Sequence, residues 1–258
     1  MAGADRKAKG SSDLGVRAVS AVVMLAVAGT AVWAGGVLWM AFVCAIAVGV
    51  LYEWVRMARR GTQDPMQRGL WNFAGMFYVG VGAAMLLFLR NPAFTLAPLL
   101  TVMLSVIAVD VGAYFAGRTF GGPKIAPAIS PSKTWSGLIG GCVGATLVLF
   151  GAVMLWQGGR ITTTPVGPAG GAQACLGSSG DCWYLTASPV AVFAQCLLFG
   201  ILLAVCAQAG DFLESWMKRR AGLKDSGNLI PGHGGFLDRV DGLLAVLFVL
   251  ALTILFQP

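Results

Sequence analysis

The charged residues of this chain gather in a stretch near its C-terminal end, between Ser215 and Asp241. Basic side chains suit phosphate, and paired carboxylates suit Mg²⁺ or another hard cation. A stretch that holds both has the groups needed for chemistry on a nucleoside triphosphate. Its charged members are Lys218, Arg219, Arg220, Lys224, Asp225, Asp238, Arg239 and Asp241. The alternative explanation of such a basic run is a solvated flank beside a membrane helix.

The middle of this stretch is a glycine-rich loop around His233, which is the single histidine of the chain. Glycine lets the backbone turn tightly and bring its N–H groups against an anion. Gly234 and Gly235 are therefore candidates for backbone contacts to phosphate, and His233 is a candidate hydrogen-bond donor. A solvated flank needs no such glycines, so the loop favours the phosphate interpretation.

Carboxylates before and after the loop are spaced to share helix faces. Asp211, Ser215 and Lys218 recur at spacings of four and three, and Asp238 and Asp241 lie three apart at the start of an apolar run. An unpaired carboxylate at a membrane border costs several kcal/mol, so Asp211 is expected to have a metal or a basic side chain as its partner. For Asp238 a buried ion pair with Arg239 or Lys218 is the structural alternative.

Two segments carry a resemblance to the phosphatidate cytidylyltransferases, also called CDP-diacylglycerol synthases. The longer one runs from Ser215 to Asp241, and the other is Ser130-Pro-Ser-Lys-Thr-Trp-Ser-Gly137, preceded by a helix end that includes Asp110 and Tyr114. Ser136 stands where many relatives carry Glu or Gln, so it is assigned no catalytic role. The resemblance covers roughly residues 105–257, and the N-terminal hundred residues match only in being hydrophobic.

The resemblance implies that the chain transfers the cytidylyl group of CTP to phosphatidate, giving CDP-diacylglycerol and pyrophosphate in phospholipid biosynthesis. It implies Mg²⁺ on Asp211 and Asp238, with two cation positions, the second open to a monovalent ion. Asp211, Lys218 and Asp238 are the expected catalytic residues. The expected substrate-binding residues are Lys133, Ser215, Arg219, Lys224, Asp225, His233, Gly234, Gly235, Arg239 and Asp241, with Asp110 and Tyr114 as further candidates. A homodimer is left open.

The composition predicts an integral membrane protein with an all-α fold. The chain has 258 residues, of which 57% are hydrophobic and 11% charged. Its net charge of +7 could suggest nucleic acid, but the basic residues sit in short loops between apolar runs, so no nucleic-acid partner is expected.

Seven apolar runs are long enough to cross a bilayer, which takes about 20 residues each, and the true number is expected to lie between six and nine. Residues 1–13 are expected to form a disordered cytoplasmic tail, 14–104 the N-terminal transmembrane helices, and 105–258 the catalytic region. The runs cover approximately residues 15–34, 37–57, 70–89, 95–117, 135–157, 189–210 and 236–257.

The distribution of Lys and Arg predicts the orientation. With a cytoplasmic N-terminus, all the basic residues except Arg90 and Arg160 fall on the inner side. The protein is therefore expected in the cell (inner) membrane, with both motifs facing the cytoplasm, where CTP is available.

Cysteines and small residues have simpler expected roles. Cys175 and Cys182 lie in the longest polar loop, and a disulfide between them or two free thiols are equally compatible with the spacing. Gly137, Gly140, Gly141 and Gly144 are spaced for close helix contact.

Two other functions are weighed against this one. Enzymes that transfer a phospho-alcohol from CDP-diacylglycerol carry an Asp-Gly-x-x-Ala-Arg pattern that is absent here, since Leu-Leu-Ala-Val follows Asp241-Gly242. An ion-coupled transporter would use intramembrane acids such as Glu53, Asp110 and Asp211. It requires them at mid-membrane depth, whereas the runs place them near cytoplasmic ends.

Overall fold

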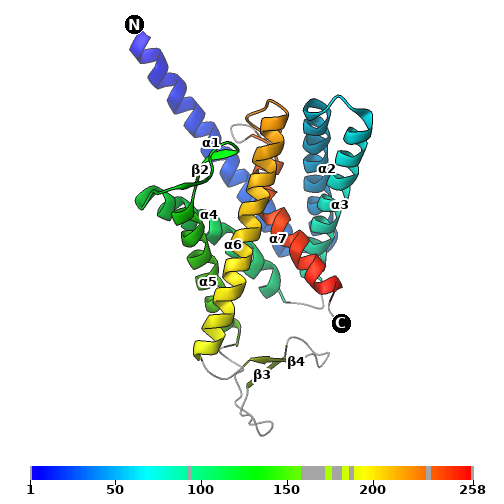
Figure 1. Ribbon diagram of the computed structural model, residues 1–258, viewed down its shortest axis with the longest axis vertical. Helices are drawn as coiled ribbons and strands as arrows, with labels where there is room; N and C mark the ends of the chain where they lie inside the picture. The colour runs from blue at the N-terminus through cyan, green and yellow to red at the C-terminus, as the bar shows by residue number, and fades with distance from the viewer. Residues whose placement is uncertain are drawn as a thin grey trace. The chain divides into compact units, whose positions relative to one another are not determined.

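The computed structural model describes residues 2–91, 95–157, 172–175, 182–185, 189–230 and 234–256. The described residues form a helical protein with two small hairpins (Figure 1), which confirms the all-α prediction. The helices are α1 (Ala2–Ala34), α2 (Gly36–Gly61), α3 (Pro65–Leu89), α4 (Ala97–Thr119), α5 (Trp135–Gln157), α6 (Pro189–Arg220) and α7 (Leu237–Leu255). The strands are β1 (Lys124–Ala126), β2 (Ser130–Thr134), β3 (Ala172–Cys175) and β4 (Cys182–Leu185).

Each predicted apolar run lies within one of these helices or overlaps it closely. Five of the helices in the described part, α2 to α6, are long and apolar enough to cross a membrane. The apolar part of α1, Ala18–Ala34, is shorter. The structure describes helix α1 from Ala2 onward, and the cytoplasmic tail expected at residues 1–13 stays a prediction. Alanine and lysine, which recur there, are good helix formers and extend the helix that follows.

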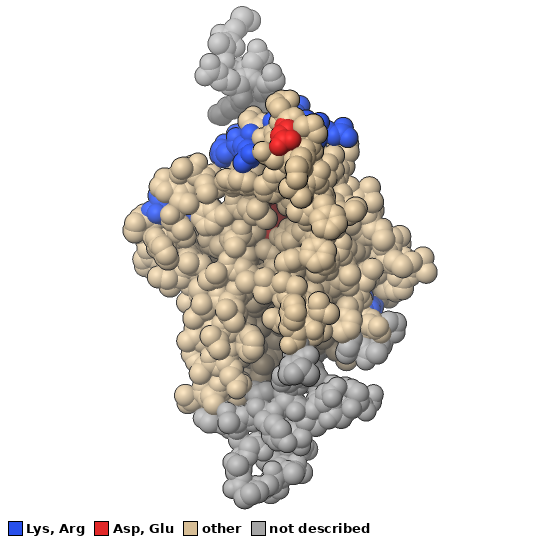
Figure 2. Space-filling view, turned by 45° about the vertical axis from the view of Figure 1, so that its right-hand side comes forward, with Lys and Arg blue, Asp and Glu red and all other residues tan. Residues whose placement is uncertain are grey.

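The helices expose apolar side chains to their surroundings, as membrane helices do. Val37 is 77% exposed, and Leu155 is 82% exposed. The face in Figure 2 is mostly free of charged residues, and its largest group of Lys and Arg lies at one end. In water such a surface would be costly, whereas in lipid it meets a solvent as apolar as itself.

The chain divides into two compact units. The first unit contains residues 1–88 and 213–258, and the second contains residues 89–212. The core of the first unit joins α2, α3, α6 and α7, and its buried members are Val50, Trp54, Met57, Val79, Met217, Leu237 and Leu244.

In the second unit, α4 and α5 lie side by side (Figure 1). A Cβ added to Gly112 would lie 2.3 Å from the carbonyl oxygen of Gly140, and one added to Gly144 would lie 2.3 Å from that of Ala108. These positions have no room for any side chain, so the backbones touch. The expectation of close helix contact through small residues is confirmed.

The hairpin β1–β2 leads into α5. Its strands pair antiparallel, with Lys124 opposite Thr134. The Thr134 side-chain oxygen accepts a hydrogen bond from the Gly137 N–H at 3.1 Å, which caps the first turn of α5. The first five residues of the shorter motif, Ser130 to Thr134, form the second strand of this hairpin.

The hairpin β3–β4 places the backbones of Cys175 and Cys182 opposite each other. The structure describes the backbones of these two cysteines and not their side chains, so the disulfide and the two free thiols both stay predictions.

Candidate active site

Lys133 and Asp211 form an ion pair in the second unit. Strand β2 carries the lysine and α6 the aspartate, and both side chains are mostly buried, with 24% and 15% exposed. Asp110 of α4 is near enough to interact electrostatically with both. The expectation that Asp211 has a cationic partner is confirmed. That partner is a lysine of the other family motif.

A second lysine lies between two carboxylates in the first unit. The Lys218 ammonium is 2.6 Å from Glu214 Oε2 and 2.8 Å from Asp238 Oδ1. Glu214 precedes Lys218 by one helical turn of α6, and Asp238 lies in the first turn of α7. The structural alternative for Asp238, an ion pair with Lys218, is therefore present. Sequence reasoning missed Glu214, although it lies one turn before Lys218 and on the same helix face.

The loop between α6 and α7 folds around the carboxylate of Asp238. Its Oδ2 atom accepts hydrogen bonds from the Gly235 N–H at 2.9 Å, the Ser226 N–H at 3.1 Å and the Ser226 hydroxyl at 3.0 Å. The Gly235 N–H, a predicted phosphate contact, thus binds Asp238 here. Gly234 has φ +83°, which favours glycine. Asp238 therefore holds both the loop, through these hydrogen bonds, and the Lys218 side chain, through the ion pair.

Glu53 of α2 anchors the same loop from within the core of the first unit. It is fully buried, and its carboxylate accepts hydrogen bonds from the backbone N–H groups of Phe236 at 3.0 Å and Leu237 at 2.9 Å, and from the Ser226 hydroxyl at 2.8 Å. A carboxylate at the N-terminus of α7 also meets the positive end of the helix dipole. These contacts give Glu53 a role in holding α7. A lone acid in an apolar helix needs a partner. This requirement is the sequence signal that could have pointed to a structural role for Glu53.

Replacing Glu53 by Gln is expected to lower the stability of the protein by about 2–4 kcal/mol, because the new amide group presents N–H toward donors that now bind the carboxylate. Thermal unfolding of the purified protein measures the change. Asp64→Asn is the matched control, since Asp64 is an exposed acid at the α2–α3 turn. Equal melting temperatures for the two variants would contradict the anchoring role.

The remaining predicted residues have varied positions. Arg219, Lys224, Asp225 and Arg239 are exposed, and Ser215 is half-buried on α6. The Tyr114 hydroxyl accepts a hydrogen bond from Arg118 at 3.1 Å, and Asp241 Oδ1 accepts one from the Gly242 N–H at 3.0 Å. His233 lies outside the described residues.

The donor set around Lys218 suits a hard cation. Among the described residues no group of three or more His, Cys, Asp or Glu side chains forms a metal centre. Glu214 Oε1, however, is buried and accepts no hydrogen bond from any described residue, and it belongs to a carboxylate that shares Lys218 with Asp238. An unsatisfied carboxylate oxygen beside a second carboxylate fits the oxygen ligands that Mg²⁺ takes.

The fold and these contacts define a polytopic helical membrane protein whose lysines neutralise carboxylates at helix ends. The chain belongs to the cytidylyltransferase family, whose model matches residues 61–256. A phosphatidate cytidylyltransferase of Brucella suis biovar 1 is 34% identical, with 93% of each chain covered. One of Rickettsia bellii is 30% identical over 92% of this chain and 89% of the relative. A phosphatidate cytidylyltransferase of Haemophilus influenzae is 31% identical over 78% of this chain and 61% of the relative.

Proposed function

We propose that the protein is a phosphatidate cytidylyltransferase, which makes CDP-diacylglycerol and pyrophosphate from CTP and phosphatidate in phospholipid biosynthesis. The observation that carries the proposal is the pairing of Asp211 with Lys133 and of Asp238 with Lys218. Each pair joins a predicted catalytic aspartate to a motif lysine suited to phosphate. The names of the relatives support the same activity.

In the proposed reaction, a phosphate oxygen of phosphatidate attacks the α-phosphorus of CTP. A new P–O bond forms, the bond between the α-phosphorus and the bridging oxygen breaks, and pyrophosphate leaves with that oxygen. The nucleophile is already an anion, so no general base is needed. The protein must bring two polyanions together and neutralise the charge that develops on the leaving group.

The lysines are suited to this task because their carboxylate partners fix them in position. Lys133, Lys218, Arg219 and Arg239 are proposed to contact phosphates, with Asp211 and Asp238 as ligands of Mg²⁺. When bound, Mg²⁺ would supply positive charge to the pyrophosphate leaving group.

Transfer of label from CTP to lipid tests the proposal. With purified protein, phosphatidate and Mg²⁺, label in the cytidine is expected in the lipid fraction, and label in the γ-phosphate is expected to stay in water as pyrophosphate. Chelation by EDTA should stop the transfer, and added Mg²⁺ should restore it. No cytidine label in lipid would contradict the activity, and full activity in EDTA would contradict the metal.

Location in the cell membrane with a cytoplasmic site is a further proposal, based on the distribution of basic residues. In sealed inside-out vesicles, external CTP should support transfer, because the cytoplasmic face is then outside. Transfer from external CTP only in right-side-out vesicles would reverse the orientation. The homodimer stays a prediction, which light scattering of the solubilised protein tests.

Replacing Lys133 by Ala is expected to lower kcat/KM by roughly one to three decades, because a charge-assisted phosphate contact is lost. Steady-state kinetics with both substrates varied measure the change. Lys124→Ala is the matched control, since Lys124 is an exposed lysine of the same hairpin. If the two variants have equal kinetics, Lys133 does not contact substrate.

A further inference from the structure

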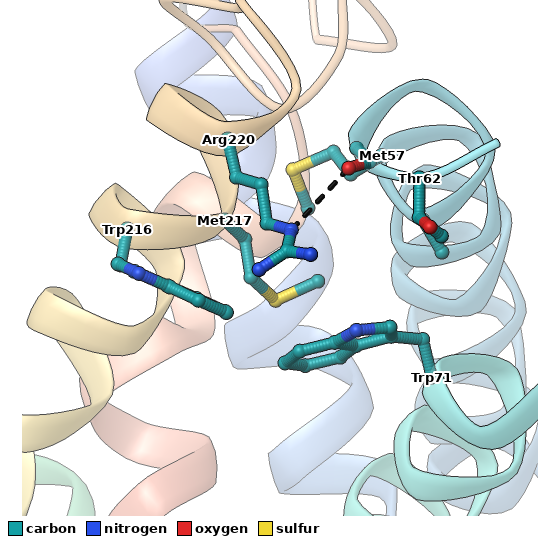
Figure 3. Close-up of a pocket in the computed structure, with 8 residues that line it drawn as sticks. Met57, Thr62, Trp71, Trp216, Met217 and Arg220 are labelled. Atoms are coloured by element: carbon teal, nitrogen blue, oxygen red, sulfur yellow. Dashed lines mark hydrogen bonds between the residues drawn. The ribbon is translucent and has the colours of Figure 1, made fainter. Parts of the chain in front are cut away.

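A pocket in the first unit shares no lining residue with the acid–lysine contacts, and it lies at the ends of membrane helices. It is lined by the last turns of α2 and α6 and by the first turns of α3 (Figure 3). Its lining residues are Met57, Ala58, Gly61, Thr62, Trp71, Trp216, Met217 and Arg220. Two tryptophans and two methionines make it apolar, and one arginine makes it positive.

Arg220 is held in place at this pocket by two contacts. Its Nε–H donates a hydrogen bond to the Gly61 carbonyl oxygen at 3.3 Å, and its guanidinium carbon lies 5.6 Å from the centre of the Trp216 ring. Figure 3 shows the guanidinium of Arg220 on the same side of the pocket as Trp216, and the rings of Trp216 and Trp71 are 5.3 Å apart. Within the described part of the chain, Arg220 forms no ion pair with a carboxylate. A guanidinium that is fixed by Nε and stacked on an aromatic ring still has its terminal nitrogens to offer to an anion.

A second arginine is fixed at the same turn. Arg68 Nη2 donates to the carbonyl oxygen of Thr62 at 3.3 Å, so Arg220 and Arg68 bind consecutive carbonyls. The Nε–H of Arg68 is buried and has no acceptor among the described residues. A buried donor without a partner is costly, and an anion near this turn would relieve that cost.

We propose that this pocket binds the phosphate of an anionic phospholipid, at a site separate from the acid–lysine contacts. The bidentate fork of Arg220 suits a phosphodiester, and the ends of membrane helices lie at the depth of lipid headgroups. Tryptophan is enriched at that depth because its ring is apolar and its N–H is polar. The pocket is open to its surroundings, and its volume of about 240 Å³ includes open solvent.

Binding of short-chain lipids to the purified protein in uncharged detergent tests the site. The probes are dihexanoyl phosphatidylglycerol, dihexanoyl phosphatidylcholine and inorganic phosphate, and the readout is the melting temperature as each is titrated. Phosphatidylglycerol is expected to raise the melting temperature of the wild-type protein more than the other two probes do. The assay contains neither CTP nor phosphatidate, so its outcome does not depend on the proposed reaction.

The variants Arg220→Gln and Arg60→Gln separate the pocket from general surface charge. Both remove one positive charge, and Arg60 is an exposed residue of the last turn of α2 that does not line the pocket. Arg220→Gln is expected to weaken the apparent affinity for phosphatidylglycerol on the order of tenfold or more, while Arg60→Gln leaves it near the wild-type value. Arg220→Lys keeps the charge but loses the fork, so an intermediate affinity is expected.

Three results would overturn the proposal. The first is equal affinity of Arg220→Gln and Arg60→Gln for phosphatidylglycerol. The second is a phosphatidylcholine effect as large as that of phosphatidylglycerol, which would show that the anion is not recognised. The third is a rise in melting temperature with inorganic phosphate as large as that with phosphatidylglycerol, which would make the pocket a site for free anions. If Arg220→Gln does not fold, wild-type affinity in Arg220→Lys would overturn the proposal in place of the first result.

Discussion

Replacing Asp238 by Asn is expected to reduce turnover at least a thousandfold, while the protein still inserts and folds. The substitution preserves shape but removes the negative charge that pairs with Lys218 and is proposed to hold Mg²⁺. Of its two acidic partners in the described part of the chain, Lys218 would keep Glu214. Incorporation of labelled CTP into lipid, measured across a range of Mg²⁺ concentrations, gives the size of the loss, and the melting temperature shows whether the fold is intact.

Asp241→Asn is the matched control for this experiment, because Asp241 lies one turn further along α7. A milder loss of activity is expected for it. Near-full Mg²⁺-dependent activity in Asp238→Asn would show that the metal assignment is wrong. The hydrogen bonds from Ser226 and Gly235 would then be the main role of Asp238.

Replacing Asp211 by Asn is expected to abolish turnover to a similar degree. Asp211 is paired with Lys133, so its loss leaves a mostly buried lysine without its carboxylate and removes a proposed metal ligand at the same time. The same assay measures the effect, and a shift in the Mg²⁺ concentration needed for half-maximal rate reports on the metal.

A double-mutant cycle with Lys133→Ala separates the two roles of Asp211. If Asp211 both binds the metal and positions Lys133, Asp211→Asn should still lower the activity of the Lys133→Ala variant by a large factor. If Asp211 serves only to hold Lys133, the double variant should be no less active than Lys133→Ala alone. That outcome would show that Asp211 is not a metal ligand.

The positions of the helices could be predicted from the sequence because bilayer thickness sets a minimum length for each apolar run. The run before Asp211 was expected to continue as a helix through Lys218, and α6 does so, ending at Arg220. The apolar run that contains Asp110 was expected at residues 95–117, and α4 begins at Ala97 with Pro98 in its first turn, where proline is tolerated.

The partners of the charged residues could not be predicted in the same way. Lys133 and Asp211 are 78 residues apart, and no periodicity in a single sequence connects them. The hairpin that carries Lys133 has strands of three and five residues, which is too short to give an alternating pattern.

The role of Glu53 could not be predicted from the sequence. Glu53 was considered only as one of the acids that an ion-coupled transporter would use, and that alternative was set aside. In the structure its partners are two backbone N–H groups and a hydroxyl of the loop before α7. The hydroxyl lies 173 residues further along the chain, and the two N–H groups lie 183 and 184 residues further, so the sequence around Glu53 does not indicate these partners.

The glycine contact between α4 and α5 also bears on the order in which the protein is assembled during synthesis. The two helices are consecutive in the chain, and their backbones meet at Gly112, Gly140 and Gly144 without any later segment. They can therefore pair as a helical hairpin as soon as both have left the translocon. Lys133 precedes α5 and so reaches the membrane border before Asp211 has been translated. The ion pair that joins α6 to this hairpin is thus a late step of biogenesis, made on a scaffold that is already in place.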